Sequence, residues 1–268
     1  MIFIKNNTPI IISDYKLFYK DTIWFSEFNN CFIKIIDYID KFNVKIKFLD
    51  EYGFETIANL DNIRKGNVKN PYRINKYGGF YGIGPYRSVD FMQIYKVWEG
   101  ILKRTSDKYN DRKSYDNVSI DKSWLNFQNF ADWYVNYIKD LNPIFIYQID
   151  KDILQWNQTI KIYSAKTCCL IPDKLNVSLV GLNLKREINP NLPVGVYHND
   201  CKYSSYITND NRRIYLGNFD NPDEAFEKYK QEKLRKIYNI ALYYYSQNGI
   251  KKDIFEALCK LNLNGGKI

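Results

Sequence analysis

The sequence predicts an α+β protein built from several small domains, and three patterns support this. Apolar and polar residues largely alternate over residues 31–38 and 44–49, at the two-residue period of strands that bury one face. Three further strand-like runs lie between residues 195 and 217, separated by Asn- and Asp-rich turns. Between these β-rich parts, apolar residues recur at helical spacing over residues 90–101 and 123–137.

Residues 1–74 are predicted to form a small β-rich N-terminal domain. The strands at 31–38 and 44–49 flank a turn at 40–43, and residues 54–58 follow a second turn as the next strand of the same meander. A small barrel or a curled sheet is the expected package. The stretch from Asn70 to Pro85 is rich in Gly and Pro, which favours a linker or an extended loop.

Residues 75–185 are predicted to form a largely helical middle domain. Its second helix carries aromatic side chains at three- and four-residue steps, so they share one face, which we expect to be core rather than a cofactor site. These residues are Trp124, Phe127, Phe130, Trp133 and Tyr134.

Residues 186–248 are predicted to form a C-terminal domain with a three-stranded antiparallel sheet and one helix. The helix begins at Asn221-Pro222-Asp223-Glu224, where an N-cap residue, a proline and two acids follow one another. An apolar stripe on this helix is expected to cover one side of the sheet: Phe226, Tyr229, Leu234, Ile237 and Ala241. Residues 249–268 are expected to be a tail.

The composition points to a polyanionic partner. Lys and Arg total 39 against 30 Asp and Glu, which gives a net charge of +9. The N-terminal residues do not resemble a secretion signal, and no apolar run approaches the ~18 residues that span a bilayer. We therefore expect a soluble, cytoplasmic protein with no membrane partner. Five cysteines without a CxxC pair argue against a disulfide framework or a zinc cage.

The C-terminal segment resembles a known DNA-binding domain. The segments that carry the resemblance are Gly195-Val196-Tyr197, Lys202-Tyr203, Tyr206-Ile207, Arg213-Ile214-Tyr215-Leu216-Gly217-Asn218-Phe219-Asp220, Glu224-Ala225-Phe226 and Tyr229. Together they look like the APETALA-two (ethylene-response-factor) domain. The resemblance implies that the sheet lies in the major groove of double-stranded DNA. The contacts it implies come from Tyr197, Lys202, Tyr203, Tyr206, Thr208, Arg213 and Tyr215.

The middle of the chain is similar to HNH homing endonucleases of bacteriophages and mobile elements. The similarity lies in residues 95–98 and 115–133, which resemble a helical lead-in, and in residues 149–154 and 163–168, which resemble the catalytic hairpin and the start of the next helix. HNH chemistry needs a His as general base, an Asn that orients it, and ligands for one divalent metal.

This chain departs from the HNH pattern at the positions that carry the chemistry. Its one His, His198, lies in the C-terminal sheet. Lys151 stands where the pattern has the catalytic His, and Thr167 where it has the closing Asn. The remaining candidates are Asp150, Lys151 and Asn157 for catalysis, and Asp150 with Asp152 for a Mg²⁺ ion, which prefers oxygen ligands.

The sequence therefore predicts a duplex-DNA-binding protein of phage or mobile-element homing-endonuclease type, with nuclease activity weak or lost. One alternative is an active metal-dependent endonuclease, in which Asp150 and Asp152 hold Mg²⁺ and Lys151, with its pKa lowered by burial, replaces the His. A second alternative is a protein-interaction module that uses the Tyr-rich surfaces.

Overall fold

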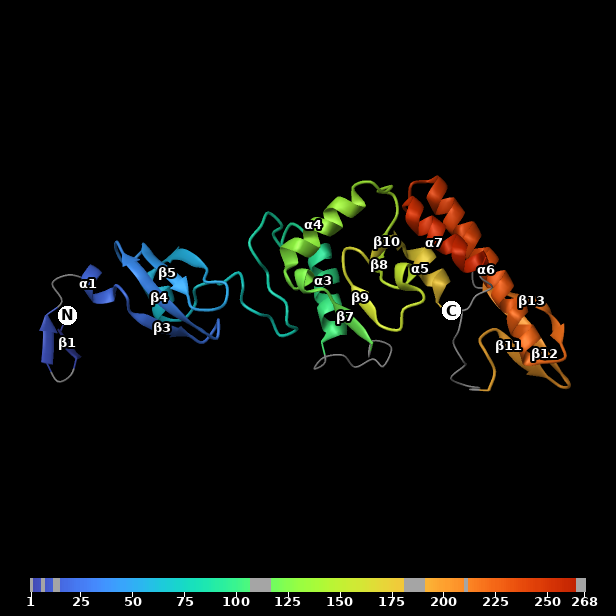
Figure 1. The fold of residues 1–268 in the computed structure, drawn as a ribbon, viewed down its shortest axis with the longest axis horizontal. Coiled ribbons are helices and arrows are strands. Elements are labelled where there is room, and N and C mark those ends of the chain that lie inside the picture. Colours follow the sequence, from blue (N-terminus) through green and yellow to red (C-terminus); the bar gives the residue numbers. More distant parts are fainter. Residues whose placement is uncertain are drawn as a thin grey trace. The chain divides into compact units, whose positions relative to one another are not determined.

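The computed structural model describes residues 2–5, 8–11, 15–106, 117–180, 191–209 and 212–263. The chain divides into two compact units, Met1–Pro85 and Tyr86–Ile268. Both contain helices together with antiparallel sheets (Figure 1), so the predicted α+β class is confirmed. Among the helices in the described ranges, none has the length and apolar character needed to cross a membrane.

The first unit is built on a four-stranded antiparallel meander. Its strands follow one another in chain order: β3 (Ile23–Ser26), β4 (Cys31–Tyr38), β5 (Val44–Phe48) and β6 (Glu55–Ala58). The predicted meander is therefore confirmed, as an open sheet with β3 and β6 at its edges rather than as a barrel. A hairpin of β1 (Ile2–Lys5) and β2 (Thr8–Ile11) precedes it.

One face of this sheet forms the core of the first unit. Along β5, Val44, Ile46 and Phe48 are fully buried and alternate with the lysines at 45 and 47, as the sequence period requires. The short helices α1 (Tyr15–Tyr19) and α2 (Leu60–Arg64) contribute buried Tyr19, Leu60 and Ile63 to the same core. The boundary with the second unit lies after Pro85, at the end of the Gly- and Pro-rich stretch, and not near residue 74.

The second unit begins with the middle region of the chain, where two helices pack on each other through aromatic rings. These are α3 (Met92–Thr105) and α4 (Phe127–Ile138), which follows the 3-10 turn η2 (Lys122–Leu125). The indole N–H of Trp98 donates to the Trp124 carbonyl at 2.7 Å, and both rings are buried. The predicted aromatic core is confirmed for Trp124, Phe127 and Phe130, whereas Trp133 and Tyr134 are only partly buried.

Two small strand pairs complete the middle region. Strand β7 (Val118–Ile120) pairs in parallel with β9 (Lys161–Tyr163), and β8 (Tyr147–Asp150) pairs antiparallel with β10 (Cys169–Pro172). The turn η3 (Ile153–Gln155) follows β8, and the helix α5 (Asp173–Leu179) follows β10.

The C-terminal sheet has the predicted order. Strands β11 (Val196–Asn199), β12 (Lys202–Asn209) and β13 (Arg212–Phe219) pair antiparallel in sequence. Helix α6 (Pro222–Ser246) follows directly. Its N-terminus is capped as expected, because the side-chain oxygen of Asn221 accepts from the backbone N–H of Glu224 at 2.8 Å.

Helix α6 packs on two different cores, and this corrects the predicted domain boundaries. Its first turns contribute Ala225 and Phe226 to a small cluster on the sheet. Its later turns contribute a second set of buried residues to a cluster shared with η3, β10, α5 and α7 (Lys252–Leu263). That second set is Leu234, Ile237, Ala241 and Tyr244.

The apolar stripe predicted for this helix therefore does not lie wholly on the sheet. The core of the second unit also extends beyond residue 248. Helix α7, in the segment expected to be a tail, buries Ile254 and Leu258 in the shared cluster. Ala225 and Phe226, near the start of α6, pack on the sheet cluster, and Lys236, farther along the helix, donates to the Thr208 carbonyl of β12 at 3.2 Å.

This arrangement predicts where substitutions on α6 destabilise the protein. Ile237→Ala removes a side chain that is 1% exposed and belongs to the shared cluster. It should lower the free energy of unfolding by about 2–4 kcal/mol, because it leaves a cavity in the shared core. Leu242→Ala, on the same helix at 43% exposure, should change it by less than about 0.5 kcal/mol. Urea unfolding followed by circular dichroism measures both, and equal effects would contradict the assignment.

Candidate nucleic-acid interface

The C-terminal sheet has one face covered by α6 and one face open. Side chains alternate between the faces, and the buried Val196, Ser205 and Ile207 mark the covered side. At Gly195, with φ of +82°, a Cβ atom would lie 2.2 Å from Cδ2 of Tyr229, so the sheet and the helix approach too closely there for any other residue.

The opposite face, called here the open face of β11–β13, carries most of the predicted DNA contacts. Register places Tyr206 opposite Tyr215 and Thr208 opposite Arg213 on neighbouring strands. The residues on this face that the sequence predicted as contacts are Tyr197, Lys202, Tyr206, Thr208, Arg213 and Tyr215.

Arg213 lies against two tyrosine rings on this face, which stand nearly perpendicular to each other. Its guanidinium carbon lies 3.7 Å from the ring centroid of Tyr197 and 4.0 Å from that of Tyr206. Tyr206 also contacts Tyr197 edge-on and Tyr215 at a tilt, with centroid distances of 5.5 and 5.4 Å. Because the two rings are nearly perpendicular, the planar guanidinium can lie parallel to only one of them, and the two contacts together restrict the direction in which it donates hydrogen bonds.

The other cation of the open face is Lys202. Its ammonium lies 3.1 Å from a carboxylate oxygen of Asp220, and both side chains are well exposed. An exposed pair of this kind contributes little to stability, so a phosphate can replace the carboxylate at small cost.

Tyr203 was also predicted as a DNA contact, but it does not share the open face with the other predicted contacts. It lies on the covered side of the sheet, where it packs against the cluster of Leu192, Val196 and Ala225. Its ring also meets that of His198 edge-on at 5.1 Å. Side chains alternate between the two faces along a strand, so Tyr203 points to the face opposite that of Lys202 and Tyr206.

Asp150, the predicted catalytic and metal-binding residue, is a structural cap. It ends β8 and is only 8% exposed. One carboxylate oxygen accepts from the backbone N–H groups of Asp152 and Ile153, each at 2.8 Å, so it fixes the turn into η3. Burial raises the pKa of Asp150 above the usual value for Asp.

Two lysines neutralise the neighbouring carboxylate. The ammonium of Lys151 donates to both oxygens of Asp152, at 2.9 and 3.1 Å, and that of Lys161 lies 4.0 Å from the same carboxylate. Lys161 also donates to the Gln155 carbonyl, and burial lowers the pKa of its ammonium. Asn157 is exposed, beyond the end of η3.

The helix expected to follow the catalytic hairpin is not at its predicted place. Residues 164–167 form a bend and a turn, β10 follows them, and α5 begins only at Asp173. Thr167, which occupies the position of the closing Asn, donates its hydroxyl to the Ile162 carbonyl at 2.5 Å. The residues that resemble an HNH motif in sequence therefore do not build its strand-to-helix geometry.

The carboxylates do not fit a magnesium ion. Asp150 already accepts two backbone donors, and the oxygens of Asp152 face two ammonium groups that would repel a divalent cation. Within the residues that the structure describes, no group of three or more His, Cys, Asp and Glu side chains comes together as a ligand set.

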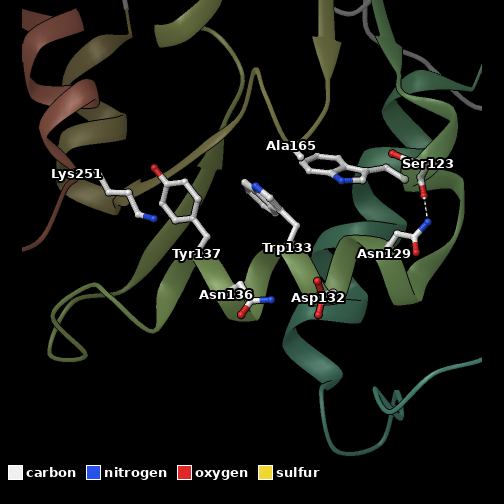
Figure 2. A pocket seen from close by; sticks show the side chains of 9 residues that line it. Ser123, Asn129, Asp132, Trp133, Asn136, Tyr137, Ala165 and Lys251 are labelled. Atoms are coloured by element: carbon white, nitrogen blue, oxygen red, sulfur yellow. Dashed lines mark hydrogen bonds between the residues drawn. The ribbon is translucent and has the colours of Figure 1, made fainter.

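A groove runs along α4 in the second unit, and no pattern in the sequence predicted it. It measures about 690 Å³ and is lined by Ser123, Trp124, Asn129, Asp132, Trp133, Asn136, Tyr137, Ala165 and Lys251. Figure 2 shows Trp133 and Tyr137 rising from α4 toward the same side, with Lys251 next to Tyr137. The Lys251 ammonium lies 4.1 Å from the Tyr137 ring centroid and 3.7 Å from Asp140, so its charge is already balanced.

Comparison of the chain with protein-family models, with curated proteins and with solved structures finds no match. The candidate interface is therefore argued from its own residues.

The buried carboxyl of Asp150 gives a stability prediction with a definite sign. Because the folded state favours its protonated form, the charged form costs stability, and stability falls as the pH rises from the ordinary Asp value through the raised one. Asp150→Asn keeps an oxygen for the two backbone donors and should unfold at a higher urea concentration than the unmodified protein at pH 7.

Asp150→Ala serves as the comparison, because it leaves both amides without their acceptor. It should lower the free energy of unfolding by about 1–3 kcal/mol. Destabilisation by the Asn substitution as large as that by Ala would show that the negative charge itself holds the site together through Lys151 and Lys161.

Proposed function

We propose that this protein binds duplex DNA through the open face of β11–β13. The observation that carries the proposal is Arg213, an exposed residue whose guanidinium lies against the rings of Tyr197 and Tyr206 on a sheet face that α6 leaves uncovered. A bidentate Arg is the commonest reader of guanine in the major groove, and its stacked rings reduce the entropy lost on binding.

The dimensions of the sheet suit the groove. Neighbouring strands lie ~4.8 Å apart, so three strands span roughly 10 Å between the outer two, against a major groove of about 12 Å. Tyr197, Tyr206 and Tyr215 offer hydroxyls for phosphates and flat rings for sugars. Thr208 and Lys202 lie on the same face and supply a further hydroxyl and a further cation.

Arg213→Ala tests the interface against a matched control. It should weaken binding of a duplex containing the preferred site by about 1–3 kcal/mol, and lower the slope of log K against log salt by about 0.9 if a phosphate contact is lost. Arg212→Ala removes the same charge one residue earlier, where the strand period turns the side chain to the other face. It should leave both quantities nearly unchanged in fluorescence anisotropy titrations.

Two results would contradict the interface. Equal losses of duplex affinity in Arg212→Ala and Arg213→Ala would indicate that the net charge of the protein attracts DNA without a specific interface. Duplex affinity that is insensitive to salt and to both substitutions would favour the alternative of a protein-interaction module.

We further propose that nuclease activity is weak or lost, although the resemblance suggests homing-endonuclease descent and, with it, a cytoplasmic site of action. A positioned general base contributes typically 10²–10⁴-fold to rate, and here Lys151 is paired with Asp152. Plasmid nicking in Mg²⁺ or Mn²⁺ should be near background and equal in Asp150→Ala. The pair Lys151→His and Thr167→Asn should not raise it, because residue 167 lies in a turn. Efficient nicking that Asp150→Ala abolishes would establish the endonuclease alternative.

A further inference from the structure

The four-stranded sheet of the first unit also has an uncovered face, and two phenylalanines lie exposed on it. Phe25 of β3 and Phe32 of β4 are paired across the strands, with ring centroids 5.1 Å apart. Their exposed fractions are 51% and 53%, whereas their neighbours Ile33 and Ile35 on the other side are fully buried. These rings contribute nothing to the core of the unit.

Lysines occupy the neighbouring positions of the same face. The row next to the phenylalanines runs from Ile23 through Lys34 and Lys47 to Glu55, across β3, β4, β5 and β6. The next row contains Asp37, Lys45 and Ile57, and Asp37 pairs with Lys16 at 3.3 Å. The three lysine side chains are 40–48% exposed.

The acids that balance these lysines are few and exposed. Lys34 pairs with Asp21 at 2.8 Å, while Lys45 and Lys47 share Glu55 at 3.1 and 3.6 Å. Ion pairs of this exposure are worth about 0–1 kcal/mol, so a phosphate can replace the carboxylates at little cost.

We propose that this face of β3–β6 binds single-stranded nucleic acid, with bases stacked on Phe25 and Phe32 and phosphates on Lys34, Lys45 and Lys47. Rings on an open sheet flanked by cations are the usual platform for unpaired bases, since every base has a flat face. This site lies in a different unit from the duplex interface and does not depend on it.

The chemistry of the face distinguishes this ligand from two others. A duplex hides the faces of its bases in the stack and offers only their edges, so the phenylalanine rings would find no partner there. A protein partner that covered the apolar residues would also cover three lysines, and burying those charges is costly unless each meets an acid.

The test uses the full chain and two fluorescein-labelled probes, a twenty-nucleotide oligo-dT and an oligo-U of equal length. Phe25→Ala combined with Phe32→Ala should weaken binding at least about tenfold, because stacking on one aromatic ring contributes ~1–3 kcal/mol per base. Phe42→Ala is the matched control, since this ring is 60% exposed in the same unit but lies in the turn between β4 and β5. It should bind as the unmodified protein does.

A second pair of substitutions separates the contribution of ring stacking from that of apolar contact. It also provides a test of the site if the alanine variant does not fold. Phe25→Leu with Phe32→Leu keeps the surface apolar but removes the rings, so it too should lose affinity. Lys34→Gln with Lys47→Gln should lower the slope of log K against log salt by about 1.4, at ~0.7 for each phosphate contact on a single strand. A preference between oligo-dT and oligo-U would show whether DNA or RNA is bound.

The outcomes of this test are separate from those of the duplex interface. The phenylalanine variants should keep duplex affinity, and Arg213→Ala should keep single-strand affinity. Unchanged oligonucleotide binding in the folded leucine variant, or equal loss in Phe42→Ala, would overturn the proposal and leave the face to a protein partner.

Discussion

The packing of α6 on two cores is the constraint on which the second unit depends. The helix is 25 residues long, so its first turns reach Val196 on the sheet while its later turns reach Cys169 and Ile171 of β10. The sheet that carries Arg213 is therefore held by a helix whose other end is fixed elsewhere, and loss of the shared core would release the interface as well.

Both units use a sheet that is covered on one side only. An antiparallel sheet needs a single buried face for stability, so the other face is free to carry side chains selected for a ligand. On β11–β13 these are tyrosines around an arginine, and on β3–β6 they are phenylalanines beside lysines. The first set offers a planar hydrogen-bond donor suited to base edges, and the second offers bare rings suited to base faces. The difference in side-chain chemistry is the reason for proposing paired nucleic acid as the ligand of the first face and unpaired nucleic acid as the ligand of the second.

The segment around Asp150 shows how a carboxylate that resembles a catalytic residue in sequence can serve the fold. A carboxylate at the end of a strand accepts two backbone N–H groups as readily as it binds a metal, and burial with amide donors favours the first role. Lysines at 151 and 161 then provide the positive charge that a metal would otherwise supply to Asp152. A sequence pattern of this kind is local, so it does not by itself specify the chemistry of the folded site.

The sequence by itself determined the local structure. Period-two alternation identified β4 and β5, helical spacing identified α3 and α4, and the cap at Asn221 identified the start of α6, because these signals depend on neighbours within a few residues. The sequence also identified most of the residues on the open face of β11–β13. Tyr203 is the exception, because the prediction did not apply strict alternation along the strand at this residue. Tertiary structure alone decided what the elements pack against. The division of α6 between two cores, the burial of α7 and the turn in place of a helix at Thr167 all depend on residues far apart in the chain, and no local pattern records which apolar face meets which.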